Sequence, residues 1–205
     1  MKIELKHVSK RFNYEWIFRE LTFDFESGNS YAITGQNGSG KSTLLKIISG
    51  QLSPSEGSVI YSAQKIINAE NIYAEVSFTA PYIELIDDFN LTEYLQFHFS
   101  FKKVLKGRSQ NDLLEISGLQ KHRNKSLKTF SSGMKQRVKL ITAILSDTPI
   151  LLLDEPTSNL DTAGVAWYLQ LIEEYKNDRI VIIGSNMERE YHFCNIILDI
   201  TEYKS

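Results

Sequence analysis

The chain has 205 residues, of which 42% are hydrophobic and 23% are charged, and its formal net charge is −2 at pH 7. This length and composition are typical of one globular domain, with or without a subdomain, that buries a sizeable core. The balanced charge argues against nucleic acid as a partner, the lack of a run of about 20 apolar residues excludes a membrane span, and the single cysteine excludes an internal disulfide framework.

The first 80 residues have the pattern of several strands around one helix. Alternating or short apolar runs predict strands at residues 3–8, 21–25, 30–34, 58–61 and 72–78. A helical pattern starts at Lys41, and Gly50 is the expected C-cap because glycine tolerates the backbone conformation that ends many helices.

The middle of the chain changes to helical periodicity. One helix is predicted at residues 90–99, where Asn90 and Glu93 have the spacing of a capping box, and a second at 109–118, closed by its final glycine. A third helix follows "FSSGMKQR" (130–137), because apolar residues then recur on one face, at Met134, Val138, Ile141 and Leu145.

Strands return in the last third, at residues 150–153, 179–184 and 195–200, with a helix at about 161–176. Strands that alternate with helices predict an α/β fold, in which helices flank a largely parallel sheet. We expect one domain over residues 1–205. Its nucleotide-binding core would comprise 1–81, with an antiparallel β part at the N-terminus, together with 148–205, and a helical subdomain would be inserted at 82–147.

The segment "GQNGSGKST" (35–43) follows a predicted strand and opens a helix, as the pattern G-x-x-x-x-G-K-[ST] requires. Its glycines let successive N–H groups point at phosphate oxygens, and the helix dipole favours the same anion. Lys41 is expected to contact the β- and γ-phosphates and Ser42 to ligate Mg²⁺. The alternative is a plain strand–helix turn. The predicted phosphate-binding residues are Gly35, Gln36, Asn37, Gly38, Ser39, Gly40, Lys41, Ser42 and Thr43.

The segment "ILLLDEP" (150–156) is an apolar run that ends in two acids. Such a run is typical of a strand buried on both faces, and ligands of parallel sheets bind beyond the carboxyl ends of the strands. Asp154 is therefore expected beside Mg²⁺, with Glu155 as the general base that activates water. The alternative is an acidic turn after a core strand.

Small residues gather at the predicted start of the third helix of the middle region, where Ser131, Ser132 and Gly133 precede Met134. A plain helix cap explains this pattern, because serine accepts hydrogen bonds from the first backbone N–H groups. The alternative is that bare amides are kept open for an anion. The segment alone leaves both interpretations open and favours the cap.

Taken in order, the loop at 35–43, "FSSGMKQR", "ILLLDEP" and "SNLD" (158–161) resemble the ATP-binding subunit of an ABC transporter over essentially the whole chain. The resemblance implies a P-loop NTPase core that binds ATP and Mg²⁺. It implies that Ser131, Ser132, Gly133 and Met134 form a signature motif for the γ-phosphate of an ATP held by a second subunit. It further implies that Asp161 lies in a D-loop that faces that subunit.

The resemblance also implies partners. We expect a second copy of the chain or a related ATPase subunit, and a separate transmembrane permease that holds the protein at the cytoplasmic face of the membrane. The signature is most similar to those of exporter-type ATPases. The family also sets an aromatic ring against adenine, and Phe12 stands at the matching position, with Tyr14 and Trp16 as alternates. A surface-loop aromatic that covers the core is the alternative for each.

The chain departs from the family pattern at three places. The signature has Ser132 for the first glycine and Met134 for the glutamine, and the small serine should still allow docking. Pro81 stands where the Q-loop glutamine is expected, and proline has no side-chain oxygen to hold a metal or a water. Asn186 stands at the switch histidine, and asparagine is shorter and cannot be charged. The expected catalytic residues are therefore Glu155, Lys41 and Asn186. We expect an ATPase of reduced rate that powers a transporter, and the alternative is a nucleotide-gated switch with very slow hydrolysis.

Overall fold

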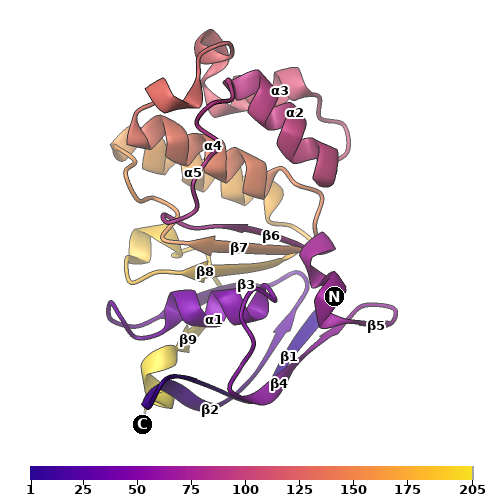
Figure 1. The fold of residues 1–205 in the computed structure, drawn as a ribbon, viewed down its shortest axis with the longest axis vertical. Coiled ribbons are helices and arrows are strands. Elements are labelled where there is room, and N and C mark those ends of the chain that lie inside the picture. Colours follow the sequence, from indigo (N-terminus) through magenta and orange to yellow (C-terminus); the bar gives the residue numbers. More distant parts are fainter. Residues whose placement is uncertain (205) are drawn as a thin grey trace.

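Two sheets with different strand directions organise the computed structural model, which describes residues 1–204 (Figure 1). The antiparallel sheet has the strand order β2-β1-β4-β5, and the parallel sheet has the order β6-β7-β8-β3-β9. The antiparallel strands are β1 (Lys2–Phe12), β2 (Glu15–Glu26), β4 (Glu56–Ser62) and β5 (Ile66–Ile67). The parallel strands are β3 (Ser30–Thr34), β6 (Val76–Thr79), β7 (Ile150–Asp154), β8 (Ile180–Gly184) and β9 (Ile196–Asp199). The α/β fold with an N-terminal antiparallel part is confirmed.

The parallel sheet has helices on both faces (Figure 1). Ile150 and Leu152 of β7 pack with α1 (Lys41–Ile48), whereas Leu151 and Leu153 pack with α4 (Ser132–Ile144) and α5 (Thr162–Tyr175). Successive side chains of a strand point to opposite faces, so a strand between two helical layers needs an unbroken apolar run. This two-sided burial explains why "ILLL" could be recognised as a strand.

The middle of the chain forms helices α2 (Leu91–Phe101), α3 (Gln110–Ser117) and α4, and the first two lie beyond α4 and α5 in Figure 1. Both α2 and α3 begin with a capping box, at Asn90 and at Ser109. Gly118 ends α3 with φ +70°, which confirms its predicted role. None of the helices within residues 1–204 is long and apolar enough to cross a bilayer.

Short 3-10 turns connect these elements and cause the main error of the strand assignment. The strand predicted at 72–78 begins only at Val76, because η1 (Ala69–Ala74) occupies the preceding residues. Ile72 is buried like a strand residue, but the Glu75 N–H donates to its carbonyl and closes a turn. The C-cap of α1 is Ser49 instead of Gly50, which follows it with φ +77°. The other 3-10 turns are η2 (Gln120–His122), η3 (Leu127–Thr129), η4 (Glu188–Glu190) and η5 (Ile200–Tyr203).

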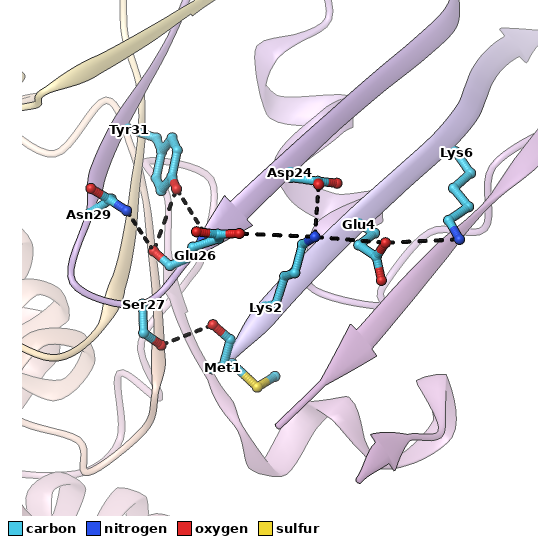
Figure 2. A network of polar contacts seen from close by, with 9 residues as sticks. All are labelled: Met1, Lys2, Glu4, Lys6, Asp24, Glu26, Ser27, Asn29 and Tyr31. Carbon is cyan, nitrogen blue, oxygen red and sulfur yellow. Dashed lines mark hydrogen bonds and ion pairs between the residues drawn. The ribbon is translucent and has the colours of Figure 1, made fainter. Parts of the chain in front are cut away.

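A polar network ties the antiparallel sheet to the parallel one (Figure 2). The Lys2 ammonium group lies 2.8 Å from the Asp24 carboxylate, an exposed pair that water and salt screen. Across the end of β2, the Glu26 N–H donates to the hydroxyl of the buried Tyr31 at 2.7 Å. Tyr31 belongs to β3, so this bond fixes the strand that leads into the glycine-rich loop.

Candidate functional site

Four loops meet at one edge of the parallel sheet, where β3, β6, β7 and β8 end. Backbone hydrogen bonds join three of them, because the Glu155 N–H donates to the Gly184 carbonyl at 2.9 Å and the Ser185 N–H donates to the Ile33 carbonyl at 3.1 Å. A side-chain bond adds a further link, from Asn186 Nδ2 to Asn37 Oδ1 at 3.1 Å. The strand directions thus bring the predicted loop, acidic pair and switch residue together.

The glycines of the 35–43 loop adopt backbone conformations that other residues avoid. Gly35, Gly38 and Gly40 have φ values of +140°, +77° and +107°. A Cβ on Gly40 would lie 2.6 Å from the Ile17 side chain, and one on Gly35 would lie 2.7 Å from Ser39 Oγ. These two glycines are therefore required by close packing as well as by the left-handed conformation.

The start of α1 differs from the start of every other α-helix in residues 1–204. Its N-cap, Gly40, offers no side-chain acceptor, and its first turn has no acidic residue. The N–H groups at this end have no side-chain acceptor, so the positive end of the helix dipole is available to an anion. Side chains cap the other four helices, at Asn90, Ser109, Ser131 and Asp161.

A cavity of about 190 Å³ opens at this helix start. Six residues of the predicted phosphate loop line it together with Glu155, so the phosphate loop and the acidic pair border the same cavity. Its walls are formed by Ile17, Asn37, Gly38, Gly40, Lys41, Ser42, Thr43 and Glu155. A larger cavity of about 300 Å³ lies between β6, α2 and α4, and none of the predicted site residues lines it.

Lys41 and Ser39 are buried parts of the same loop. Lys41 is 5% exposed and donates to the carbonyls of Gly35 at 2.8 Å and Gln36 at 3.2 Å. The hydroxyl of Ser39 is buried without a hydrogen-bond partner. An ammonium group held inside a glycine-rich loop by neutral carbonyls is a binding group for phosphate.

Asp154 has the properties of a metal ligand. Its side chain is 2% exposed, and its Oδ1 atom is buried without a hydrogen-bond partner. Burial raises the pKa of this carboxyl group, and a hydrogen bond from Ser42 opposes the rise. Within residues 1–204 no three His, Cys, Asp or Glu side chains cluster around a metal position. Two oxygen ligands fit Mg²⁺, which takes most of its other ligands from phosphates and water.

Glu155 follows Asp154 in the chain and lines the cavity. It is half-buried, and its backbone has φ +43°, a conformation that costs energy for a residue with a side chain. Ser158 is the first residue of "SNLD", and the sequence alone predicted no separate role for it. Its hydroxyl donates to Glu155 Oε2 at 3.4 Å. The glutamate is thus held at the mouth of the cavity, where a general base has to stand.

The signature segment forms a separate surface. Ser131 caps α4, since its hydroxyl accepts from the Met134 N–H at 3.3 Å, and so the helix-cap interpretation is confirmed. A Cβ on Gly133 would lie 3.0 Å from the Asn159 carbonyl, so the D-loop requires a small residue here. Ser131 and Ser132 are exposed, and no residue of the signature lines the cavity among the residues described.

Two predicted roles depend on surfaces outside the cavity. Asp161 caps α5 by accepting from the Gly164 N–H at 2.7 Å, and its side chain is exposed. Phe12 is 49% exposed and lies under the Lys10 ammonium group, 5.2 Å from it, without lining the cavity.

The alternates for the aromatic ring lie elsewhere too. Tyr14 is 96% exposed, and Trp16 stacks between the guanidinium groups of Arg11 and Arg19. Ile17 is the residue of this hairpin that lines the cavity. No sequence signal indicated Ile17, because its position depends on how the β1–β2 hairpin folds over α1.

Pro81 contributes through its backbone. Its carbonyl accepts a hydrogen bond from Lys139 Nζ of α4 at 2.9 Å, which joins the loop after β6 to the signature helix. Asn186 is exposed, and its bond to Asn37 holds it beside the glycine-rich loop. Both positions thus lie at the edge where the predicted nucleotide would bind.

Comparison with known proteins gives a consistent result. The ABC transporter family model matches residues 18–158. The chain is 33% identical to the uncharacterized ABC transporter ATP-binding protein YybJ of Bacillus subtilis, over 97% of the chain and 92% of that protein. It is 32% identical to the energy-coupling factor transporter ATP-binding protein EcfA1 of Thermotoga maritima, over 93% of the chain and 74% of that protein. A dimeric bacterial ABC transporter cassette of known structure has a TM-score of 0.79 and 25% identity, over 97% of this chain and 95% of that one.

Proposed function

Because the chain belongs to the ABC transporter family of ATP-binding subunits, we propose that it hydrolyses ATP with Mg²⁺ to drive a separate transmembrane permease. The observation that carries the proposal is the cavity at the uncapped start of α1, which combines Lys41, Ser42 and Glu155. A cationic, amide-rich cavity with a carboxylate at its mouth suits a polyphosphate whose terminal group is attacked by water.

Each residue has a distinct task in this reaction. The loop amides and Lys41 would bind the β- and γ-phosphates, and Ser42 and Asp154 would hold Mg²⁺, which would supply charge neutralisation for the phosphates. Glu155 takes a proton from a water molecule, whose oxygen bonds to the γ-phosphorus as the bond to the ADP oxygen breaks. Since this transition state needs little covalent help, positioning and charge account for most of the catalysis.

The signature segment supports an assembly of two subunits. Ser131 and Ser132 are exposed, and none of residues 131–134 lines the cavity of their own chain. A second copy, or a related subunit, would supply this segment to the γ-phosphate, and the first chain would do the same in return. ATP would then lie at a two-fold, isologous interface, and closing that interface would be the step that moves the permease.

The permease would hold the protein at the cytoplasmic face of the membrane. The proposal follows the transporter relatives of the chain, one of which is an ATP-binding protein of an energy-coupling factor transporter. Substrate contacts would lie on the permease, and the ATPase subunit would supply the closing movement.

Two observations favour a second candidate function, a nucleotide-gated switch that hydrolyses ATP very slowly. Pro81 has only its carbonyl to offer, and Lys139 already occupies it. Asn186 reaches Asn37 with a short neutral side chain. We propose slow but real hydrolysis, since Lys41 and Glu155 are both present at the cavity.

Glu155→Gln tests the proposal. The variant keeps the shape of the side chain but cannot accept the proton, so we expect phosphate release to fall by about 10²–10⁴-fold. With ATP and Mg²⁺ it should accumulate as a dimer, which light scattering measures, whereas the nucleotide-free protein should be mainly monomeric.

The matched control is Glu56→Gln, which makes the same chemical change at an exposed residue of β4. It should behave like the wild type in both assays. A monomer under every nucleotide condition would contradict the two-subunit site. Phosphate release that is unaffected by Glu155→Gln would contradict the assignment of the general base.

A further inference from the structure

Glu190 is a fully buried acid that the proposed reaction does not use. It ends the 3-10 turn η4, four residues after Asn186. Its Oε1 atom accepts a hydrogen bond from the Thr157 N–H at 2.9 Å and another from the Thr157 hydroxyl. Because hydrogen bonds to a carboxylate are stronger than those between neutral groups, this pair of bonds ties the segment after β8 firmly to the loop after β7.

The backbone of Glu190 is fixed as well as its side chain. The Tyr168 hydroxyl of α5 donates to the Glu190 carbonyl at 3.0 Å, and the Glu190 N–H donates to the Met187 carbonyl at 2.9 Å. Tyr168 is itself fully buried. Glu190 is therefore an anchored acceptor for the loop that carries Thr157.

Thr157 belongs to the turn that begins at Glu155. The Ser158 N–H donates to the Glu155 carbonyl at 3.1 Å and closes this turn. Inside it, the Pro156 carbonyl accepts a hydrogen bond from Gln136 Nε2 of α4 at 2.7 Å. Gln136 and Thr157 are both 2% exposed. A buried side chain from another element thus holds each of the two residues that follow Glu155.

This turn sets the direction in which the Glu155 side chain leaves the backbone. Glu155 has φ +43°, and its N–H donates to the Gly184 carbonyl at the end of β8 at 2.9 Å. A residue with a side chain keeps such a backbone conformation only where its surroundings enforce it. The hydrogen bonds at Gly184, Pro156 and Thr157 supply that enforcement.

We propose that Glu190 is a positioning residue for the general base, which it holds at the cavity through Thr157. The inference rests on the proposed function. Glu190 does not line the cavity, so its effect on the reaction passes through the turn that carries Glu155. An error of about 1 Å in the position of a catalytic group can cost about 100-fold in rate. Weaker anchoring of the turn should therefore lower turnover and leave ATP binding unchanged.

Thr157→Val tests this inference because it removes the hydroxyl and keeps the shape of the side chain. We expect kcat for phosphate release to fall about 10-fold, with an unchanged KM and an unchanged affinity for a non-hydrolysable ATP analogue. Thr157→Ser restores a hydroxyl and should recover most of the lost rate. Glu190→Gln offers a neutral and weaker acceptor, so it should slow release in the same direction and carries the test if Thr157→Val does not fold.

The same substitution in the Glu155→Gln protein shows whether Thr157 acts through the base. Once the base is gone its position no longer matters, so Thr157→Val should cause no further loss of single-turnover hydrolysis. A merely structural role of the hydroxyl would lower the rate by the same factor in both backgrounds.

Thr142→Val is the matched control, because it removes another buried threonine hydroxyl. That hydroxyl donates to the Val138 and Lys139 carbonyls of α4, at 3.1 and 3.0 Å, so it also makes hydrogen bonds inside the protein. The change lies on a helix instead of in the turn. Phosphate release by Thr142→Val should equal that of the wild type.

Three results would overturn the inference and leave the proposed function intact. The first is a wild-type rate of Thr157→Val or of Glu190→Gln. The second is a Thr157→Ser protein as slow as Thr157→Val, because the hydroxyl would then not be the group that matters. The third is an equal loss in the Glu155→Gln protein. A wild-type protein that binds no ATP analogue would instead overturn the proposed function.

Discussion

The loops at the edge of the parallel sheet fall into two groups. Those after β3 and β7 adjoin Lys41, Ser42 and Asp154 and include Glu155, the residues that match the family pattern. Those after β6 and β8 carry proline and asparagine where the pattern has glutamine and histidine. Since the backbone brings all four loops to one place, the difference lies in the side chains alone. Under the proposed function the first group binds the nucleotide and the second sets the rate, so we expect substitutions in the two groups to change these two properties separately.

The two groups also differ in how firmly they are held. Lys41 and Asp154 are 5% and 2% exposed, and the glycines around them have backbone conformations that packing enforces. Asn186 is exposed and makes one side-chain bond, while Pro81 contributes a carbonyl. Substitution in the second group disturbs little of the core, so those residues are free to set the rate.

The largest effect is expected in the first group. Among the described residues, Lys41 carries the only ammonium group that lines the cavity at the start of α1, and Lys41→Ala removes it. Loss of hydrogen bonds between a charged group and two phosphates should weaken ATP binding about 100-fold and abolish turnover. Equilibrium binding of a fluorescent ATP analogue measures the change, with the exposed Lys125→Ala as control. Unchanged affinity of Lys41→Ala would remove the basis for assigning the cavity to phosphate.

The two groups also differ in how much could be predicted from sequence. The phosphate loop and the acidic pair are contiguous motifs, so their neighbours along the chain reveal them. The contact between Lys46 and Tyr82 depends on the loop after β6 lying against α1, and the wall formed by Ile17 depends on the fold of a hairpin over α1. Neither arrangement leaves a local signal.

Most helices and strands could be predicted for a related reason. Capping boxes and one-sided apolar stripes are local, so α2, α3 and α4 matched their expected positions. The run at 72–78 failed because Ile72 is buried from a 3-10 turn, and burial alone does not distinguish such a turn from a strand.

A moderate effect, in the opposite direction, is expected in the second group. Asn186→His restores a longer side chain that can hold the γ-phosphate and the attacking water in line. One well-placed donor contributes about 10²–10³-fold to a rate, and asparagine retains part of that effect, so we expect phosphate release to rise about 10-fold. ATP affinity should stay constant.

Steady-state phosphate release checks this prediction, with Asn124→His as a control in an exposed loop. If Asn186→His is no faster than the wild type, asparagine is not a weakened switch. The site would then orient its water by other groups, and the second group of loops would not limit the rate.

The smallest effect is expected for Pro81→Gln. The new amide would enter a loop whose course is already held by the contact between the Lys46 ammonium group and the Tyr82 ring, 4.2 Å apart. The hydrogen bond from Lys139 ends on the carbonyl of residue 81 and survives the change. Loss of the rigid ring costs about 0.4–1 kcal/mol of stability through the unfolded chain. We therefore expect phosphate release within about threefold of the wild type and a slightly lower melting temperature.

Pro81→Gln in the Asn186→His protein tests whether the two positions of the second group act independently. If they do, the double variant should release phosphate about as fast as Asn186→His alone. Clearly faster release by the double variant would mean that the two loops act together on the rate. A Pro81→Gln protein that hydrolyses ATP faster than Asn186→His would contradict this order, because proline would then be the residue that limits the rate.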